Sequence, residues 1–233
     1  MSQLTIETNV SEIVTVLPQS ADLFRKLRID YCCGGKISLR EAAEQRELDP
    51  IDVLAKVQKM EEKWVSRQSM HPSSFGEKTL VAYIQEKYHE SLREELPLLS
   101  PYVTKVARVH GERDPHLLKV LEIFNTLRKE LIDHTDDEDL NVFPMILKFF
   151  ENPSEELKYK LRPHVAELEE EHDNTGALFH ELREITNHFT PPKDACGTYR
   201  LVYARLEQLE KDTFEHVHLE NNILFERVKT HLN

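Results

Sequence analysis

The 233-residue sequence contains only 6 glycines and shows no sustained alternation of apolar and polar residues between turn residues. That alternation is the mark of a strand, so its absence argues against a sheet. Charged residues make up 31% of the chain, and Leu, Glu and Lys dominate its long segments, as is typical of helices. The sequence therefore predicts an all-α protein.

Long apolar runs, basic runs and a signal peptide are also missing. The first residues, MSQLTIETNVSEIV, lack the charged start and apolar core of a secretory signal. A net charge of -12 argues against sequence-independent binding to nucleic acid or to anionic lipid. Three cysteines, two of them adjacent, are more typical of reduced thiols than of a disulfide framework. We therefore expect a cytoplasmic protein with no nucleic-acid and no membrane partner.

Breaks in the helical pattern divide the chain into three parts. Residues 1–62 predict a small domain of short helices, capped by Asn9 or Ser11, by Ser20, and by Ser38 with Glu41 as a capping box. Residues 63–76 are polar, contain Ser, Pro and Gly, and predict a linker.

Residues 77–233 predict an antiparallel four-helix bundle, because four long helical patterns follow one another with short connections. Pro97 and Pro101 are expected to kink or restart the first helix. The expected helices span residues 79–109, 115–150, 154–188 and 198–229.

Two pairs of one histidine and one glutamate carry the chemistry of this bundle. His134 with Glu138, and His216 with Glu220, are each one helical turn apart and therefore share a helix face. A lone histidine precedes each pair on the helix before it, at nearly the same spacing: His89 and His172. One such pair is usually a surface pair, but two matched sets on facing helices predict a metal site.

Counting the ligands indicates how many metal ions this site holds. Imidazole and carboxylate together suit Fe, Mn or Zn, and six ligands are too many for one tetrahedral zinc. If both glutamates bridge two irons, each iron also receives two histidines, and an oxide or hydroxide bridge leaves one open position. The predicted cofactor is therefore an oxo- or hydroxo-bridged pair of iron ions in a reactive centre.

Several neighbouring residues have open interpretations. His218 lies about 200° around the helix from the preceding ligand and is expected at the surface. His110 could support a ligand or be exposed. Glu130 and Glu171 could orient a ligand imidazole or be solvated. Gly176 leaves space beside a ligand, or permits close helix packing.

Six segments of the sequence together resemble the bacterial di-iron iron–sulfur cluster repair proteins, which join a small cysteine-bearing domain to a hemerythrin-like bundle. The resemblance implies metal ligation by the same six residues, with both glutamates bridging, and action in the cytoplasm under nitrosative or oxidative stress. It implies damaged iron–sulfur proteins as partners and leaves a homodimer open. The segments are DYCCGG, YHESLREELP, DHTDDEDLNVFPMI, EHDNTG, PPKDACGTYRLVY and EHVHLENNILF.

The adjacent thiols of Cys32 and Cys33 form a second candidate site. They precede Gly34 and Gly35, whose conformational freedom suits a loop. Thiolates bind iron or copper(I) and can be redox-active, although two small packed residues would give the same pattern. Cys196, at a junction between loop and helix, is expected to be structural.

These features favour a di-iron protein that repairs damaged iron–sulfur clusters by supplying iron or electrons, and that is not itself an enzyme. One alternative is a reductase of nitric oxide or peroxide that uses the same centre. Another is a sensor that binds O2 or NO and signals through the N-terminal domain.

Overall fold

The computed structural model describes residues 4–64 and 72–232. Helices joined by turns and loops make up this part of the chain, and it contains no strand. An isolated bridge joins Asn9 and Ser38. The all-α class predicted from the sequence is confirmed. Residues 65–71 of the predicted linker lie outside the described residues, so the predicted division at residues 62 and 77 stays a prediction.

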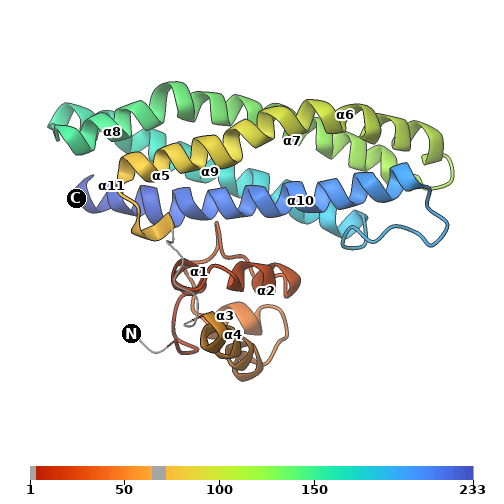
Figure 1. The fold of residues 1–233 in the computed structure, drawn as a ribbon, viewed down its shortest axis with the longest axis horizontal. Coiled ribbons are helices and arrows are strands. Elements are labelled where there is room, and N and C mark those ends of the chain that lie inside the picture. Colours follow the sequence, from red (N-terminus) through yellow and green to blue (C-terminus); the bar gives the residue numbers. More distant parts are fainter. Residues whose placement is uncertain (1–3, 65–71, 233) are drawn as a thin grey trace. The chain divides into compact units, whose positions relative to one another are not determined.

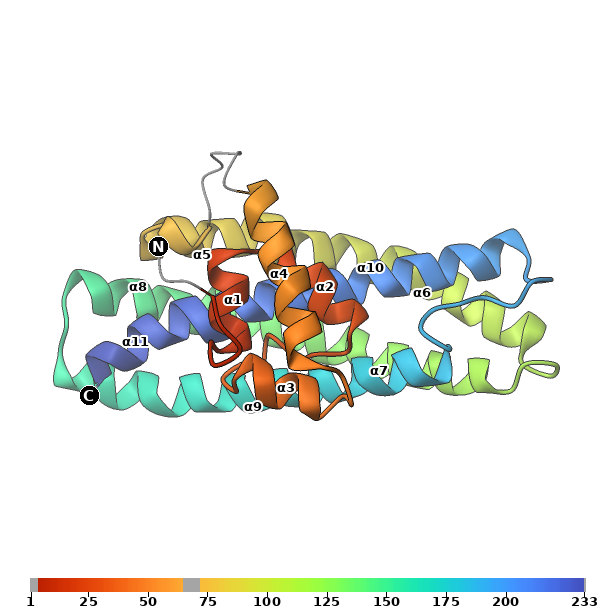
Figure 2. The same cartoon turned by 90° about the horizontal axis from the view of Figure 1, so that it is seen from below.

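Four helices follow the N-terminus, three of six or seven residues and a fourth of 15 (Figure 2). The Ser38 hydroxyl accepts a hydrogen bond from the Glu41 backbone N–H at 3.2 Å, so the predicted cap of the third helix is confirmed. The Ser20 prediction is wrong, because Ser20 is the buried first residue of its helix and no side chain caps that end. The helices are α1 (Val10–Val16), α2 (Ser20–Lys26), α3 (Leu39–Glu44) and α4 (Pro50–Trp64).

The rest of the chain forms the four long helical arms that the sequence predicts (Figure 1). Three of the arms contain one π-helical turn. The first arm runs through Pro97 and Pro101 without a break, so it does not restart there. After η1 (Pro72–Ser74), the arms are α5 (Glu77–Ile84), η2 (Gln85–His89) and α6 (Glu90–His110); α7 (His116–Asp137), η3 (Glu138–Val142) and α8 (Phe143–Glu151); α9 (Glu155–Ile185); and α10 (Gly197–Leu219), η4 (Glu220–Leu224) and α11 (Phe225–Leu232).

The chain divides into two compact units, residues 81–213 and residues 1–80 with 214–233. In the first unit α6 packs on α7, and α7 on α9. The Arg205–Glu95 ion pair joins α10 to α6, and the Arg183–Glu210 pair joins α10 to α9. Fully buried side chains such as Leu96, Leu127 and Phe179 fill the space between these helices. In the second unit α1 packs on η4.

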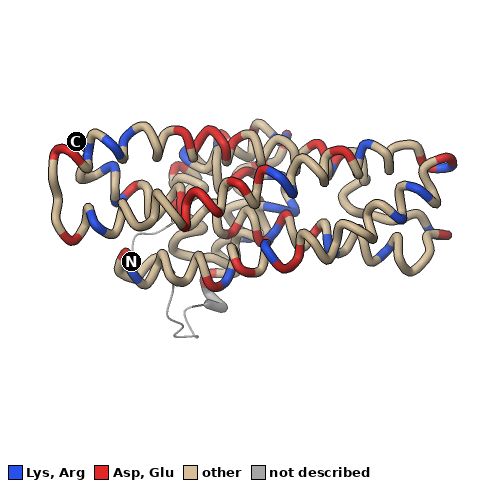
Figure 3. The backbone as a smooth tube through the Cα atoms, turned by 90° about the horizontal axis from the view of Figure 1, so that it is seen from above, with Lys and Arg blue, Asp and Glu red and all other residues tan. Residues whose placement is uncertain are grey.

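Acidic and basic residues are interspersed along the helices (Figure 3). This distribution agrees with the solvated outer face of an amphipathic helix. Among the described residues, no helix has both the length and the apolar character that crossing a membrane requires.

Candidate metal centre

Three of the six predicted ligands lie in π-helical turns. His89 is the last residue of η2, Glu138 is the first of η3, and Glu220 is the first of η4. A π turn holds one more residue than an α turn and often marks a functional site. The local backbone is thus irregular at the residues predicted to bind metal.

Within residues 81–213, four predicted ligands meet in the core. Glu138 Oε2 lies 3.3 Å from His134 Nε2 and 3.5 Å from His89 Nε2. His172 Nε2 lies 2.8 Å from His134 Nε2. All four side chains are buried, with exposed fractions of 8% or less. The Nε2 atoms of three histidines therefore converge near one carboxylate.

The surroundings of the Glu138 carboxylate indicate whether these residues suit a metal ion. It is completely buried, and neither of its oxygens accepts a hydrogen bond from the part of the chain that the structure describes. Burial alone would raise its pKa, but the imidazoles of His134, His89 and His172 lower it. A buried carboxylate without hydrogen bonds is costly, and a bound cation would offset that cost. The donor set fits a metal.

The outer nitrogens of two histidines bind carboxylates. His89 Nδ1 lies 2.8 Å from Asp139 Oδ1, and His134 Nδ1 lies 2.5 Å from Glu171 Oε2. The hydrogen bond with His134 lowers the pKa of Glu171. A carboxylate on Nδ1 favours the tautomer whose Nε2 lone pair is free for a metal. Both rings are therefore oriented for ligation through Nε2.

Asp139 is a residue of η3, and three side chains bind its carboxylate. Its Oδ1 accepts a hydrogen bond from Gln85 at 3.0 Å as well as binding His89. Its Oδ2 accepts from Arg93 at 2.6 Å. Burial would raise the pKa of Asp139, but the bonds with His89, Arg93 and Gln85 lower it to about 2. Asp139 is thus a fixed anion behind His89.

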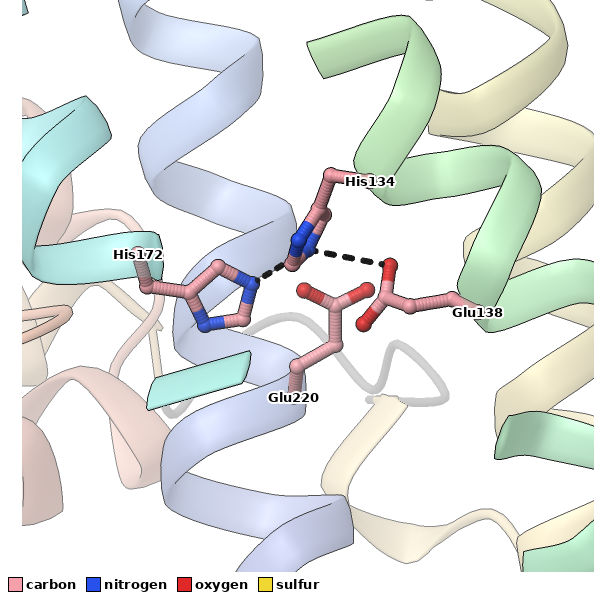
Figure 4. Close-up of side chains that lie close together, drawn as sticks. All are labelled: His134, Glu138, His172 and Glu220. Carbon is pink, nitrogen blue, oxygen red and sulfur yellow. Dashed lines mark hydrogen bonds and ion pairs between the residues drawn. The ribbon is translucent and has the colours of Figure 1, made fainter. Parts of the chain in front are cut away.

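The remaining predicted ligands, His216 and Glu220, are both fully buried and lie one turn apart, with His216 Nε2 3.9 Å from Glu220 Oε2. Within each unit taken by itself, candidate ligand atoms lie within 4.8 Å of one another and form one group. Figure 4 shows the side chains of His134, Glu138 and His172 turned toward one another. The groups are His134, Glu138 and His172 in residues 81–213, and His216 with Glu220 in the other unit.

The prediction for His218 is wrong. His218 is 3% exposed, its Nδ1 lies 3.3 Å from the Tyr31 carbonyl, and its Nε2 lies 3.4 Å from Thr15 Oγ1. The helical angle correctly turns it away from His216. However, residues of the N-terminal helices and loop lie on that side, within the same compact unit.

The residues left open by the sequence have distinct surroundings. Glu171 contacts His134, although the sequence places it beside His172. Gly176 is buried in α9. Glu130 lines a cavity of about 600 Å³ that reaches His134 and also includes Glu171. His110 is half-buried and lies against the exposed Cys196, with Nε2 3.4 Å from Sγ.

The contacts of Asp139 and Asn222 are not predictable from the sequence. Asp139 stands in the run DDED, where nothing distinguishes it from its acidic neighbours. Asn222 donates a hydrogen bond to the Cys32 carbonyl at 2.8 Å. Cys32 and Cys33 are free cysteines in the loop between α2 and α3. Neither belongs to the two ligand groups found in the described residues.

The chain matches two known protein families in separate segments. Residues 6–61 match a domain of unknown function (ScdA_N), and residues 81–228 match the hemerythrin HHE cation binding domain. The chain is 39% identical to the iron–sulfur cluster repair protein ScdA of Staphylococcus haemolyticus, over 96% of this chain and 99% of that protein. It is 36% identical to the iron–sulfur cluster repair protein YtfE of Escherichia coli O81, over 94% of each chain.

Proposed function

Because the chain belongs to the iron–sulfur cluster repair family and carries its hemerythrin-type cation-binding domain, we propose that it repairs damaged iron–sulfur clusters with two bound iron ions. The observation that carries the iron proposal is the buried Glu138 carboxylate, which faces the Nε2 atoms of His89 and His134. The proposed ligands are His89, His134, Glu138, His172, His216 and Glu220, with the two glutamates bridging.

The chain's own residues prepare this centre. Asp139 and Glu171 hold protons on the Nδ1 atoms of His89 and His134, which leaves Nε2 of each ring to bind metal. Burial of all six ligands limits the access of water. With no thiolate among them, these ligands bind iron less tightly than sulfur ligands would. Bound iron would supply an exchangeable ion and one-electron chemistry to the damaged cluster.

We place this activity in the cytoplasm and take damaged iron–sulfur proteins as partners. The three cysteines are free, which agrees with a reducing compartment. The names of the relatives specify iron–sulfur clusters as the object of repair. Action under nitrosative or oxidative stress follows, because nitric oxide and peroxide damage exposed clusters.

A reconstitution assay tests the proposed function. A [4Fe–4S] dehydratase is inactivated with peroxide, and the iron-loaded protein is added with a reductant. We expect the dehydratase to regain activity with the loaded protein and not with the iron-free protein. An equal amount of free iron is the control. Recovery no greater than that given by free iron would reject repair, and catalytic loss of nitric oxide from the same sample would favour the reductase instead.

Replacing Asp139 with asparagine is expected to weaken iron binding by about 10- to 100-fold, the usual effect of losing a group that orients a histidine ligand. The amide keeps the size of the side chain but not the charge that Arg93 and His89 bind. The measurement is iron retained against a graded chelator. Asp136→Asn is the matched control, because Asp136 also binds Arg93 but is 52% exposed. Equal iron affinity in both variants would contradict the role given to Asp139.

A further inference from the structure

Glu220 stands between two residues that contact the loop carrying the thiols. Asn222 donates to the Cys32 carbonyl at 2.8 Å and lies 3.5 Å from the Tyr31 carbonyl. His218 Nδ1 lies 3.3 Å from the same Tyr31 carbonyl. The flanking residues and the loop belong to one compact unit. The helical turn that bears Glu220 is therefore bound on both sides of that residue to the backbone of residues 31 and 32.

The loop of residues 30–35, hereafter the thiol loop, is held at its thiols by hydrogen bonds to one side chain. The Asp30 carboxylate accepts hydrogen bonds from the backbone N–H groups of Cys32, Cys33 and Gly34, at 3.0, 3.1 and 3.0 Å. At Gly35 an added Cβ would lie 2.5 Å from the Tyr31 carbonyl oxygen, so only glycine fits. If one thiol is displaced, the neighbouring backbone carbonyls are therefore expected to move with it.

The two thiols differ in access. Cys32 is 2% exposed, and its Sγ lies 3.4 Å from Asp30 Oδ1. Cys33 is only partly buried, and its Sγ lies 3.6 Å from that of Cys32. An electrophile or a soft metal ion from solvent therefore meets Cys33 first. The Cys32 carbonyl, which Asn222 binds, is on the adjacent residue.

We propose that Asn222, assisted by His218, is a positioning residue that couples the thiol loop to the metal ligand Glu220. A group bound at Cys33 displaces the Cys32 carbonyl, and this breaks the hydrogen bond that Asn222 of η4 donates to that carbonyl. Because Glu220 lies in the same turn, it then holds iron less firmly. This inference rests on the proposed iron site and adds a route by which a client or ligand at the thiols promotes iron release. Coupling of two sites through one shared element commonly changes affinity by about 5- to 150-fold.

The test uses the full iron-loaded chain with Cys196→Ser, so that Cys32 and Cys33 are the thiols left to react. Iodoacetamide is added until mass spectrometry shows one adduct, and iron transfer to a ferrous chelator is timed under reducing conditions. We expect the adduct to release iron about tenfold faster than the unmodified protein. The unmodified Asn222→Ala protein should already release iron at the faster rate. Alkylation of this variant should then increase its iron-release rate by less than about twofold.

Asn141→Ala is the matched control, because Asn141 lies in the corresponding turn after Glu138 and donates to Asp137. It should keep the full response to alkylation. A second readout needs no iron: Asn222→Ala should change the alkylation rate of Cys33 in the iron-free protein, and Asn222→Gln should partly restore it. An unchanged iron-release rate after alkylation of a chain that holds its iron overturns the coupling. A chain that binds no iron at all instead overturns the proposed function.

Discussion

Glu138→Gln is expected to remove most of the bound iron and to weaken iron affinity by more than about 100-fold, beyond the effect typical of groups that only orient ligands. Glutamine matches glutamate in shape, so the helix and its packing remain. Its amide carries no charge and offers one good donor oxygen in place of two, so it cannot bridge two ions. The measurement is iron per chain after gel filtration, together with visible absorption.

Glu122→Gln is the control for this variant, because Glu122 is an acidic residue of α7 whose side chain is 67% exposed, and it should leave the iron content unchanged. The iron-free forms provide an independent check. Without metal, the buried carboxylate is costly, so iron-free Glu138→Gln should melt no lower than the iron-free parent. Full iron content in Glu138→Gln would show that Glu138 is not a ligand.

The sequence predicted the helical arms and the candidate ligands because both follow from local periodicity. The matched histidines and glutamates stand at helical spacing, and helices of this length keep that spacing in the folded chain. The π turns were not predictable in the same way. They arise from one additional residue per turn at His89, Glu138 and Glu220, and no residue type marks such an insertion.

The surroundings of a side chain were predicted wrongly, or not at all, where tertiary contacts determine them. The helical angle of His218 was correct, but the inference of exposure failed because Tyr31 and Thr15 lie on that side of the helix. Glu171 is adjacent in sequence to His172 and yet binds His134 on another helix. A single sequence gives the direction of a side chain on its own helix, but not the partner that it meets there.

The bundle also contains a buried ion pair that is not part of the proposed metal site. Arg183 on α9 donates through Nε to Glu210 Oε1 at 2.7 Å and through a second nitrogen to Oε2. Glu210 is completely buried, Arg183 is 8% exposed, and the guanidinium lies 5.1 Å from the Phe189 ring centroid. Such a pair stabilises a fold weakly in comparison with apolar packing, but loss of one partner leaves a buried charge.

Arg183→Met is therefore expected to lower the free energy of unfolding by about 3 to 5 kcal/mol, and the melting temperature by roughly 10 °C in a chain of this size. The double variant Arg183→Met/Glu210→Leu should recover most of this loss, because it removes both charges and keeps the volume apolar. The exposed pair of Lys160 and Glu156 provides the contrast, since Lys160→Met should change stability by less than about 1 kcal/mol. Urea unfolding followed by helical circular dichroism measures all three variants. A double variant as unstable as Arg183→Met alone would show that lost packing, and not an uncompensated buried charge, causes the effect.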